Sequence, residues 1–161
     1  MAKVLVVYYS RSGNTEKMAK LVGEGVEKGG VQAVIKRVQD VAVDELLEYD
    51  GVISGSPTYY GGMAWEMKKL IDDSVKLHGK LDGKVGAAFT SSANIGGGNE
   101  TTILDMLNAW LIHGMIVQGD PQGDHYGRVS INAPDARVEA QCRRMGERVA
   151  ELVKKIAGQT E

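Results

Sequence analysis

Three hydroxyl side chains, an arginine, an amide and a glycine stand together in the segment Ser10-Arg11-Ser12-Gly13-Asn14-Thr15. The segment lies between an apolar run and a stretch with helical periodicity. The start of a helix offers free N–H groups and about half a positive charge, hydroxyls donate to phosphate oxygens, and Gly13 lets the backbone curl around an anion. In the alternative interpretation Ser12 or Thr15 only caps its own helix, but a cap needs one such residue. We therefore interpret the segment as a phosphate-binding loop.

Two better-known phosphate motifs are absent from the chain. The nucleoside-triphosphate loop needs four residues between its glycine and the Gly-Lys pair, and the run from Gly79 to Lys84 has one too few and ends before Val85. The segment Gly23-Glu24-Gly25 lacks the third glycine of a dinucleotide fingerprint and falls inside a predicted helix. The predicted phosphate site is therefore of another kind.

A second segment, Ser56-Pro57-Thr58-Tyr59-Tyr60-Gly61-Gly62-Met63, combines a rigid proline with two tyrosines and two glycines. Tyrosine rings offer flat faces for stacking, and glycines let a backbone approach a flat surface closely. The alternative is a surface turn with one tyrosine folded onto the core. The candidate binding residues in this segment are Pro57, Thr58, Tyr59, Tyr60 and Gly61.

A third segment of the same kind runs from residue 90 to residue 101 and contains three consecutive glycines. Glycines give up backbone entropy on folding, which is reasonable where the main chain must lie along a ligand. The alternative is a flexible loop. The candidate binding residues are Thr90, Ser91, Ser92, Asn94, Gly96, Gly97 and Gly98.

Together the three segments describe a pocket with an anion-binding end and a flat aromatic end. A phosphorylated planar heterocycle fits such a pocket. Flavin mononucleotide (FMN) fits best, because the sequence shows no second phosphate site.

The segments sit between alternating strands and helices, which must position them. Apolar runs predict strands at residues 3–9, 31–38, 50–56, 84–90 and 115–118, and helical periodicity predicts helices at 15–28, 43–49, 63–75, 100–112 and 135–156. Parallel neighbours need helical crossovers, so the alternation predicts a doubly wound parallel sheet of the flavodoxin-like order 2-1-3-4-5 with helices on both faces. In such sheets ligands bind beyond the carboxyl ends of the strands, where the three segments lie. Residues 119–134 are expected to be irregular, as a loop over a site or a contact surface.

Apolar spacing also predicts which helix faces are buried. Trp65, Trp110 and Cys142 are expected to be packing residues, with a subunit contact as the alternative for the Trp65 side. The predicted inner faces are Met63, Met67, Leu70, Ile71 and Ser74 in one helix, Ile103, Leu104, Leu107 and Leu111 in the next, and Val138, Cys142, Met145, Val149, Leu152 and Ile156 in the last.

Composition excludes several classes of protein. A chain of 161 residues suits one domain, 1–161, and 43% hydrophobic with 25% charged residues is a globular balance. The net charge of −2 argues against nucleic acid as a partner. No apolar run approaches the ~20 residues of a membrane helix, and no secretory signal is visible, so we expect a cytoplasmic protein. One cysteine, and isolated His78 and His125, predict no metal site.

The quoted segments resemble the flavodoxin superfamily and, within it, the WrbA-type NAD(P)H:quinone oxidoreductases. The segment 10–15 is similar to the family's FMN-phosphate loop, and 57–64 is similar to the segment that lines the isoalloxazine ring. The run Gly96-Gly97-Gly98-Asn99-Glu100-Thr101-Thr102 is similar to its glycine-rich segment, and His113-Gly114-Met115 resembles its turn before the fifth strand. The four motifs occur in the family's order.

The resemblance implies a flavoprotein that takes hydride from NAD(P)H and passes electrons through FMN to quinones. The alternative is a flavodoxin-type carrier that moves single electrons between proteins. A carrier usually presents a strongly acidic docking face, and a net charge of −2 modestly favours the enzyme. A phospho-acceptor receiver domain is excluded, because Ser54-Gly55-Ser56 stands where its aspartate would be.

Two expectations depend on the resemblance alone. His113 reaches a flavin site in the WrbA type, which implies a catalytic role, whereas the residue's place at a helix C-terminus favours a structural one. The WrbA type also forms tetramers through insertions, and the segments around 38–50, 72–84 and 119–134 are shorter here. A homo-oligomer, dimer or tetramer, is still expected.

Overall fold

The computed structural model describes residues 1–158, which alternate between strands and helices along most of the chain. Short 3₁₀ helices link some of these elements. In chain order the elements are β1 (Lys3–Tyr8), α1 (Asn14–Lys28), β2 (Gln32–Arg37), η1 (Val38–Asp40), η2 (Val43–Glu48), β3 (Gly51–Pro57), α2 (Trp65–Asp73), η3 (Ser74–Leu77), β4 (Val85–Ser92), α3 (Asn99–Ile112), β5 (Ile116–Val117), β6 (Arg128–Ile131) and α4 (Ala136–Ile156).

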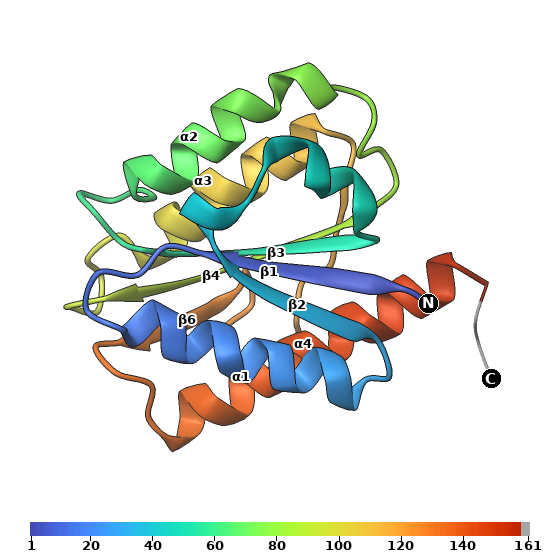
Figure 1. The fold of residues 1–161 in the computed structure, drawn as a ribbon. Coiled ribbons are helices and arrows are strands. Elements are labelled where there is room, and N and C mark those ends of the chain that lie inside the picture. Colours follow the sequence, from blue (N-terminus) through green and yellow to red (C-terminus); the bar gives the residue numbers. More distant parts are fainter. Residues whose placement is uncertain (159–161) are drawn as a thin grey trace.

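All strand pairs are parallel, in the order β2-β1-β3-β4-β5 that the sequence predicted. Helices α1 and α4 cover one face of the sheet, and α2 and α3 cover the other (Figure 1). The central strands are buried on both faces, as continuous apolar runs require. The carboxyl ends of β1, β3 and β4 therefore lie side by side at one edge of the molecule.

The expectation of an irregular stretch at 119–134 is wrong in part, because β6 lies within it. This strand pairs with the second half of β4, from Phe89 opposite Arg128 to Ser92 opposite Ile131. Strand β5 pairs only with the beginning of β4, so two separate segments fill the fifth position of the sheet. Alternating Arg-Val-Ser-Ile gives a weak strand signal, and burying its arginine requires a partner from elsewhere.

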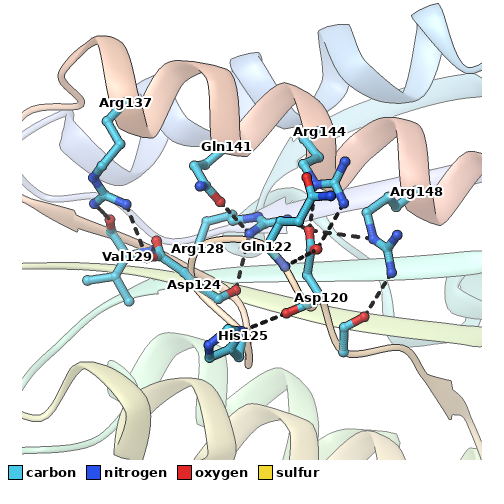
Figure 2. A network of polar contacts seen from close by, with 11 residues as sticks. Asp120, Gln122, Asp124, His125, Arg128, Val129, Arg137, Gln141, Arg144 and Arg148 are labelled. Atoms are coloured by element: carbon cyan, nitrogen blue, oxygen red, sulfur yellow. Dashed lines mark hydrogen bonds and ion pairs between the residues drawn. The ribbon is translucent and has the colours of Figure 1, made fainter.

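That partner is Asp120, which holds the segment between β5 and β6 against α4 (Figure 2). Its carboxylate accepts hydrogen bonds from Arg144 at 2.8 and 3.0 Å, from the buried Arg128, and from the backbone N–H of Gln122 at 2.9 Å. Arg148 adds a bond to the neighbouring Gly119 carbonyl at 2.9 Å. Arg144 and the other donors hold the pKa of the Asp120 carboxyl well below its usual range.

The predicted inner face of α3 is also partly wrong. Leu104 and Leu111 are 38% and 56% exposed, and Met106 and Trp110 occupy the buried positions beside Ile103 and Leu107. Apolar residues surround most of this helix, so their spacing alone did not define one face. Trp65, expected to pack, is 70% exposed, whereas Trp110 is buried and donates to Ser54 Oγ at 3.0 Å.

The buried stripe of α4 includes Cys142, as predicted, and burial raises the pKa of its thiol to about 12. At neutral pH the thiol is therefore protonated and serves packing. Among residues 1–158, no helix is long and apolar enough to cross a membrane.

Candidate cofactor site

One cavity of about 270 Å³ lies where the loops after β1, β3 and β4 meet. The loops meet because the carboxyl ends of adjacent parallel strands share one edge of the sheet. The lining residues are Arg11, Ser12, Asn14, Thr15, Pro57, Thr58, Tyr59, Ser91, Ser92, Ala93 and Asn132. The cavity thus draws on all three segments that the sequence singled out.

The first loop leads directly into α1 through Gly13, whose φ of 98° is left-handed and suits glycine. The backbone N–H of Gly13 donates to Ser10 Oγ at 3.1 Å, which closes the loop on itself. The helix has no side-chain cap. The amide groups of its first turn are therefore left for an anion at the cavity, where the helix dipole favours negative charge.

Thr15 joins the first loop to the third. Its Oγ1 lies 2.9 Å from Ser91 Oγ, and both side chains are buried. Arg11 and Ser12, by contrast, are exposed at the rim of the cavity. The loop therefore offers an ordered floor of hydroxyls and a rim with one positive charge.

The second loop reverses direction in a tight turn at Tyr60 and Gly61, which both have positive φ, 49° and 80°. Tyr59 and Gly62 flank the turn and pair through two backbone hydrogen bonds of 2.9 and 3.2 Å. Positive φ at both central residues defines a type I′ turn. The turn directs the two tyrosines differently. Tyr59 lines the cavity, and Tyr60 is fully exposed.

Tyr59 is held by an aromatic neighbour. The rings of Tyr9 and Tyr59 meet edge to face, with centroids 6.4 Å apart and planes at 76°. Such pairs stabilise by about 0.5–1.5 kcal/mol beyond burial. The alternative interpretation, in which one of the two adjacent tyrosines folds onto the core, does not describe this arrangement, since Tyr59 is still 39% exposed.

Thr90 joins the third loop to the second. Its Oγ1 lies 2.8 Å from Thr58 Oγ1 and donates to the Ser56 carbonyl at 2.7 Å. Further along, Asn99 accepts from the Gly96 N–H at 3.1 Å and donates to Ser92 Oγ, which closes the glycine-rich loop. Asn94, Gly96 and Gly97 are exposed on this loop and do not line the cavity.

Gly98 brings the second and third loops into direct contact. Its φ is 103°, and a Cβ placed there would lie 2.6 Å from Gly61 Cα. Both features require glycine. The glycine at position 98 therefore allows the two backbones to approach each other closely.

Two cavity residues were missed by sequence reasoning, Ala93 and Asn132. Asn132 follows β6, has a φ of 59°, and donates its backbone N–H to the Ser92 carbonyl at 2.8 Å. Asparagine tolerates left-handed backbone, but nothing local in the sequence links it to residue 92. Finding it required knowing that β6 pairs with β4.

The structure does not bring His113 to the cavity. It caps the far end of α3, a helix about 20 Å long whose other end meets the loops. Its Nε2 lies 2.8 Å from Ser74 Oγ, and its ring sits 6.2 Å from that of Trp110. Burial, with a smaller effect of His78, lowers the pKa of His113. This geometry matches the structural interpretation of the residue.

The cavity fits the cofactor that the sequence suggested. Uncapped amides and hydroxyls at the start of α1 suit a phosphate, and Tyr59 with the backbones of the second and third loops suits a planar ring. Within residues 1–158, no group of three or more His, Cys, Asp or Glu side chains could hold a metal ion. The amides, hydroxyls and tyrosine at the cavity suit an organic phosphate.

Comparison with known proteins leads to the same family that the sequence resembles. The flavodoxin family pattern matches residues 6–111. A flavodoxin from Clostridium saccharobutylicum is 40% identical over 162 residues, which cover 96% of this chain and 99% of the relative. An NAD(P)H dehydrogenase (quinone) from Archaeoglobus fulgidus is 36% identical over 190 residues, which cover 97% and 100%. The crystal structure of a WrbA-like flavodoxin from Agrobacterium tumefaciens matches with a TM-score of 0.82 at 28% identity, covering 96% of this chain and 99% of that one. The chain belongs to the flavodoxin family, whose members bind FMN.

Proposed function

We propose that the protein is an FMN-dependent oxidoreductase that passes electrons from NAD(P)H to quinones. The observation that carries the proposal is a single cavity in which a hydroxyl-rich helix start and a tyrosine-lined turn meet. The 36% identical relative named as an NAD(P)H dehydrogenase (quinone) supports the choice of donor and acceptor.

When bound, FMN supplies the redox chemistry, and the protein contributes binding, orientation and electrostatics. The first turn of α1 and the hydroxyls of Ser10, Ser12 and Thr15 hold the phosphate end. Tyr59, held edge-on by Tyr9, orients the ring end. Backbone N–H groups of Tyr60, Gly61 and the loop after β4 favour added negative charge on the ring, by the logic of an oxyanion hole.

A second candidate function is a one-electron carrier between redox proteins. The 40% identical flavodoxin favours it. The chain's net charge of −2 favours the enzyme, because a weak field steers a protein partner poorly.

An anaerobic absorption titration of the FMN-loaded protein separates the two functions. NADPH and then NADH are added, with free FMN at the same concentration as the control. Bleaching of the bound flavin faster than free FMN, and its reversal by benzoquinone, is the expected result. Flavin that stays oxidised with both nucleotides would overturn the proposal in favour of the carrier.

A further inference from the structure

A second cavity, of about 230 Å³, lies between α2 and the segment that follows β2. Segment η1 starts directly after β2, and α2 follows the loop after β3, so this groove opens at the same edge of the sheet as the cofactor cavity (Figure 1). Its lining residues are Val38, Gln39, Val41, Val43, Trp65, Glu66, Lys69, Leu70 and Asp73. We call it the Trp65 groove.

The Trp65 groove has an aromatic wall, an apolar floor and a polar rim. The indole of Trp65 is 70% exposed, although tryptophan is normally well buried. Val38 and Leu70 are buried beneath the groove, and Gln39 and Lys69 are exposed at its edge. Lys69 pairs with Asp73 at 2.5 Å on the surface of α2, and an exposed pair of this kind contributes little and exchanges readily.

Glu66 gives the groove a hydrogen-bond acceptor that lacks a donor. Its Oε2 is buried and has no hydrogen-bond partner among residues 1–158. A buried acceptor without a partner destabilises a protein, and a charged acceptor does so more strongly. A ligand with an N–H group would relieve that penalty.

The same side chain connects the groove to the cofactor cavity. The Glu66 carboxylate lies beside the Tyr9 hydroxyl and raises the pKa of Tyr9. Tyr9 in turn packs edge-on against Tyr59, which lines the cofactor cavity. Tyr9 therefore links Glu66, which lines the Trp65 groove, to Tyr59, which lines the cofactor cavity.

We propose that the Trp65 groove binds the adenosine half of the pyridine nucleotide, an inference that rests on the proposed function. The purine ring stacks on the exposed indole of Trp65, and its amino group donates to Glu66 Oε2. The Gln39 amide carries the donor and acceptor that match the adenine edge. The Lys69 ammonium faces the phosphates. The nicotinamide half is then directed past Tyr9 and Tyr59 toward the cofactor cavity.

The chain offers a selective probe, because it has two tryptophans and Trp110 is buried on the opposite side of α3 from solvent. We would record the two indole N–H signals of the ¹⁵N-labelled, FMN-loaded protein and assign them with Trp65→Phe. Adenosine monophosphate is titrated in, with nicotinamide mononucleotide as the control ligand. The Trp65 signal should move with the adenine ligand only, and the Trp110 signal should stay in place.

Two variants test the recognition itself. Gln39→Ala, at an exposed position that leaves the fold intact, and Glu66→Gln should each weaken binding of adenosine monophosphate by about threefold or more, as expected for loss of a direct hydrogen bond. In steady-state kinetics Trp65→Ala should raise KM for NAD(P)H about tenfold with kcat unchanged. The exposed Val75→Ala, outside the groove, is the matched control.

The proposal is overturned if millimolar adenosine monophosphate leaves the Trp65 signal unmoved, or if nicotinamide mononucleotide moves it equally. The outcomes separate the two proposals. Adenine binding without NAD(P)H oxidation keeps the groove assignment and rejects the enzyme. NAD(P)H oxidation with the same KM in Trp65→Ala keeps the enzyme and rejects the groove assignment.

Discussion

Thr15 and Thr90 tie the three cavity loops to one another within the protein itself. Thr15 reaches Ser91, and Thr90 reaches both Thr58 and the Ser56 carbonyl, at 2.7–2.9 Å. These bonds hold the loops near one geometry, which reduces the entropy that ordering them on binding would cost. The hydroxyl side chains at this site thus order the loops, and we propose that they also contact the phosphate.

The double substitution Ser10→Ala with Thr15→Ala should weaken FMN binding strongly. Each hydrogen bond to a charged group contributes about 1.5–3 kcal/mol, or roughly tenfold or more in Kd per hydroxyl. The measurement is quenching of FMN fluorescence by the apoprotein. The control is Lys155→Ala, because this residue is exposed on the last turn of α4, away from the cavity. Equal FMN affinity in both variants would contradict the phosphate assignment.

His113→Gln should change the stability of the protein and leave flavin binding and turnover unaltered. Burial lowers the pKa of His113 below its unfolded value of about 6.5, so the neutral ring contributes stability above that pH. This contribution is lost as pH falls from about 6.5 toward the folded pKa. Urea denaturation across this range should show a decline in wild type that the variant lacks. A folded variant without turnover would restore the catalytic interpretation.

At the scale of elements, two helices begin at the cavity after a glycine with left-handed φ. Gly13 precedes α1 and Gly98 precedes α3, at 98° and 103°. Neither helix has a side-chain cap, so both present first-turn amides at the edge of the sheet that holds the candidate cofactor cavity. The turn geometry, as much as the helix dipole, therefore directs these N–H groups.

Gly98→Ala should disturb the contact between the second and third loops, whereas Gly96→Ala should not. Both glycines have positive φ, but a Cβ at Gly98 meets the Gly61 backbone and a Cβ at Gly96 meets open space. We expect a loss of about 1–3 kcal/mol for backbone strain at Gly98 plus weaker FMN binding, and only about 1 kcal/mol at Gly96. Thermal unfolding and FMN titration of the two variants measure these losses. Matching losses would refute the close-approach argument.

Asp120→Asn should detach the segment between β5 and β6 from α4. It leaves buried Arg128 without its charged partner, for which a loss of about 3–5 kcal/mol at pH 7 is typical. In wild type the pKa of Asp120 lies below its unfolded value, so the stability that this carboxylate contributes is complete above about pH 4. That contribution is lost progressively as pH falls below about 4. Unfolding free energies at pH 7 and pH 3 should therefore differ more in wild type than in the variant. The exposed Asp72→Asn is the control, with little change expected.

At the scale of the whole molecule, the two faces of the sheet differ in how completely their helices cover apolar residues. The outer side of α3 exposes Leu104, Leu111 and Ile112, the last by 72%. Exposed apolar residues that gather on one helix mark an interaction surface more often than scattered ones do. We therefore propose this face of α3 as the contact surface of the expected homo-oligomer.

Leu104→Glu with Leu111→Glu should convert an oligomer into a monomer. A two-fold interface uses the same patch twice, so two charges on each copy place four charges in one contact. Size-exclusion chromatography with light scattering measures the change, and Ile156→Glu on α4, across the sheet, is the control. A wild-type chain that is monomeric at every concentration would show that α3 is not such an interface.

Local signals in the sequence were sufficient for much of this protein. The apolar runs around Val4 to Val7 and Val52 to Ile53, with the helices between them, predicted the parallel sheet and its order, because strand and helix periods are set by neighbouring residues. The hydroxyl-rich and glycine-rich segments predicted where a phosphorylated ring would bind, since strand ends in such a sheet share an edge.

Three features depended on contacts between distant residues, which no local pattern contains. Strand β6 can bury Arg128 because the Asp120 carboxylate neutralises it and Gln141 of α4 accepts a hydrogen bond from it. Asn132 reaches the cavity only through the pairing of β6 with β4, and the inner face of α3 was decided by which side of an apolar helix met the sheet. The sequence by itself determined the elements and the chemistry of their loops. Only the tertiary structure decided which charged and apolar groups were buried, because burial depends on the whole packed molecule rather than on neighbouring residues.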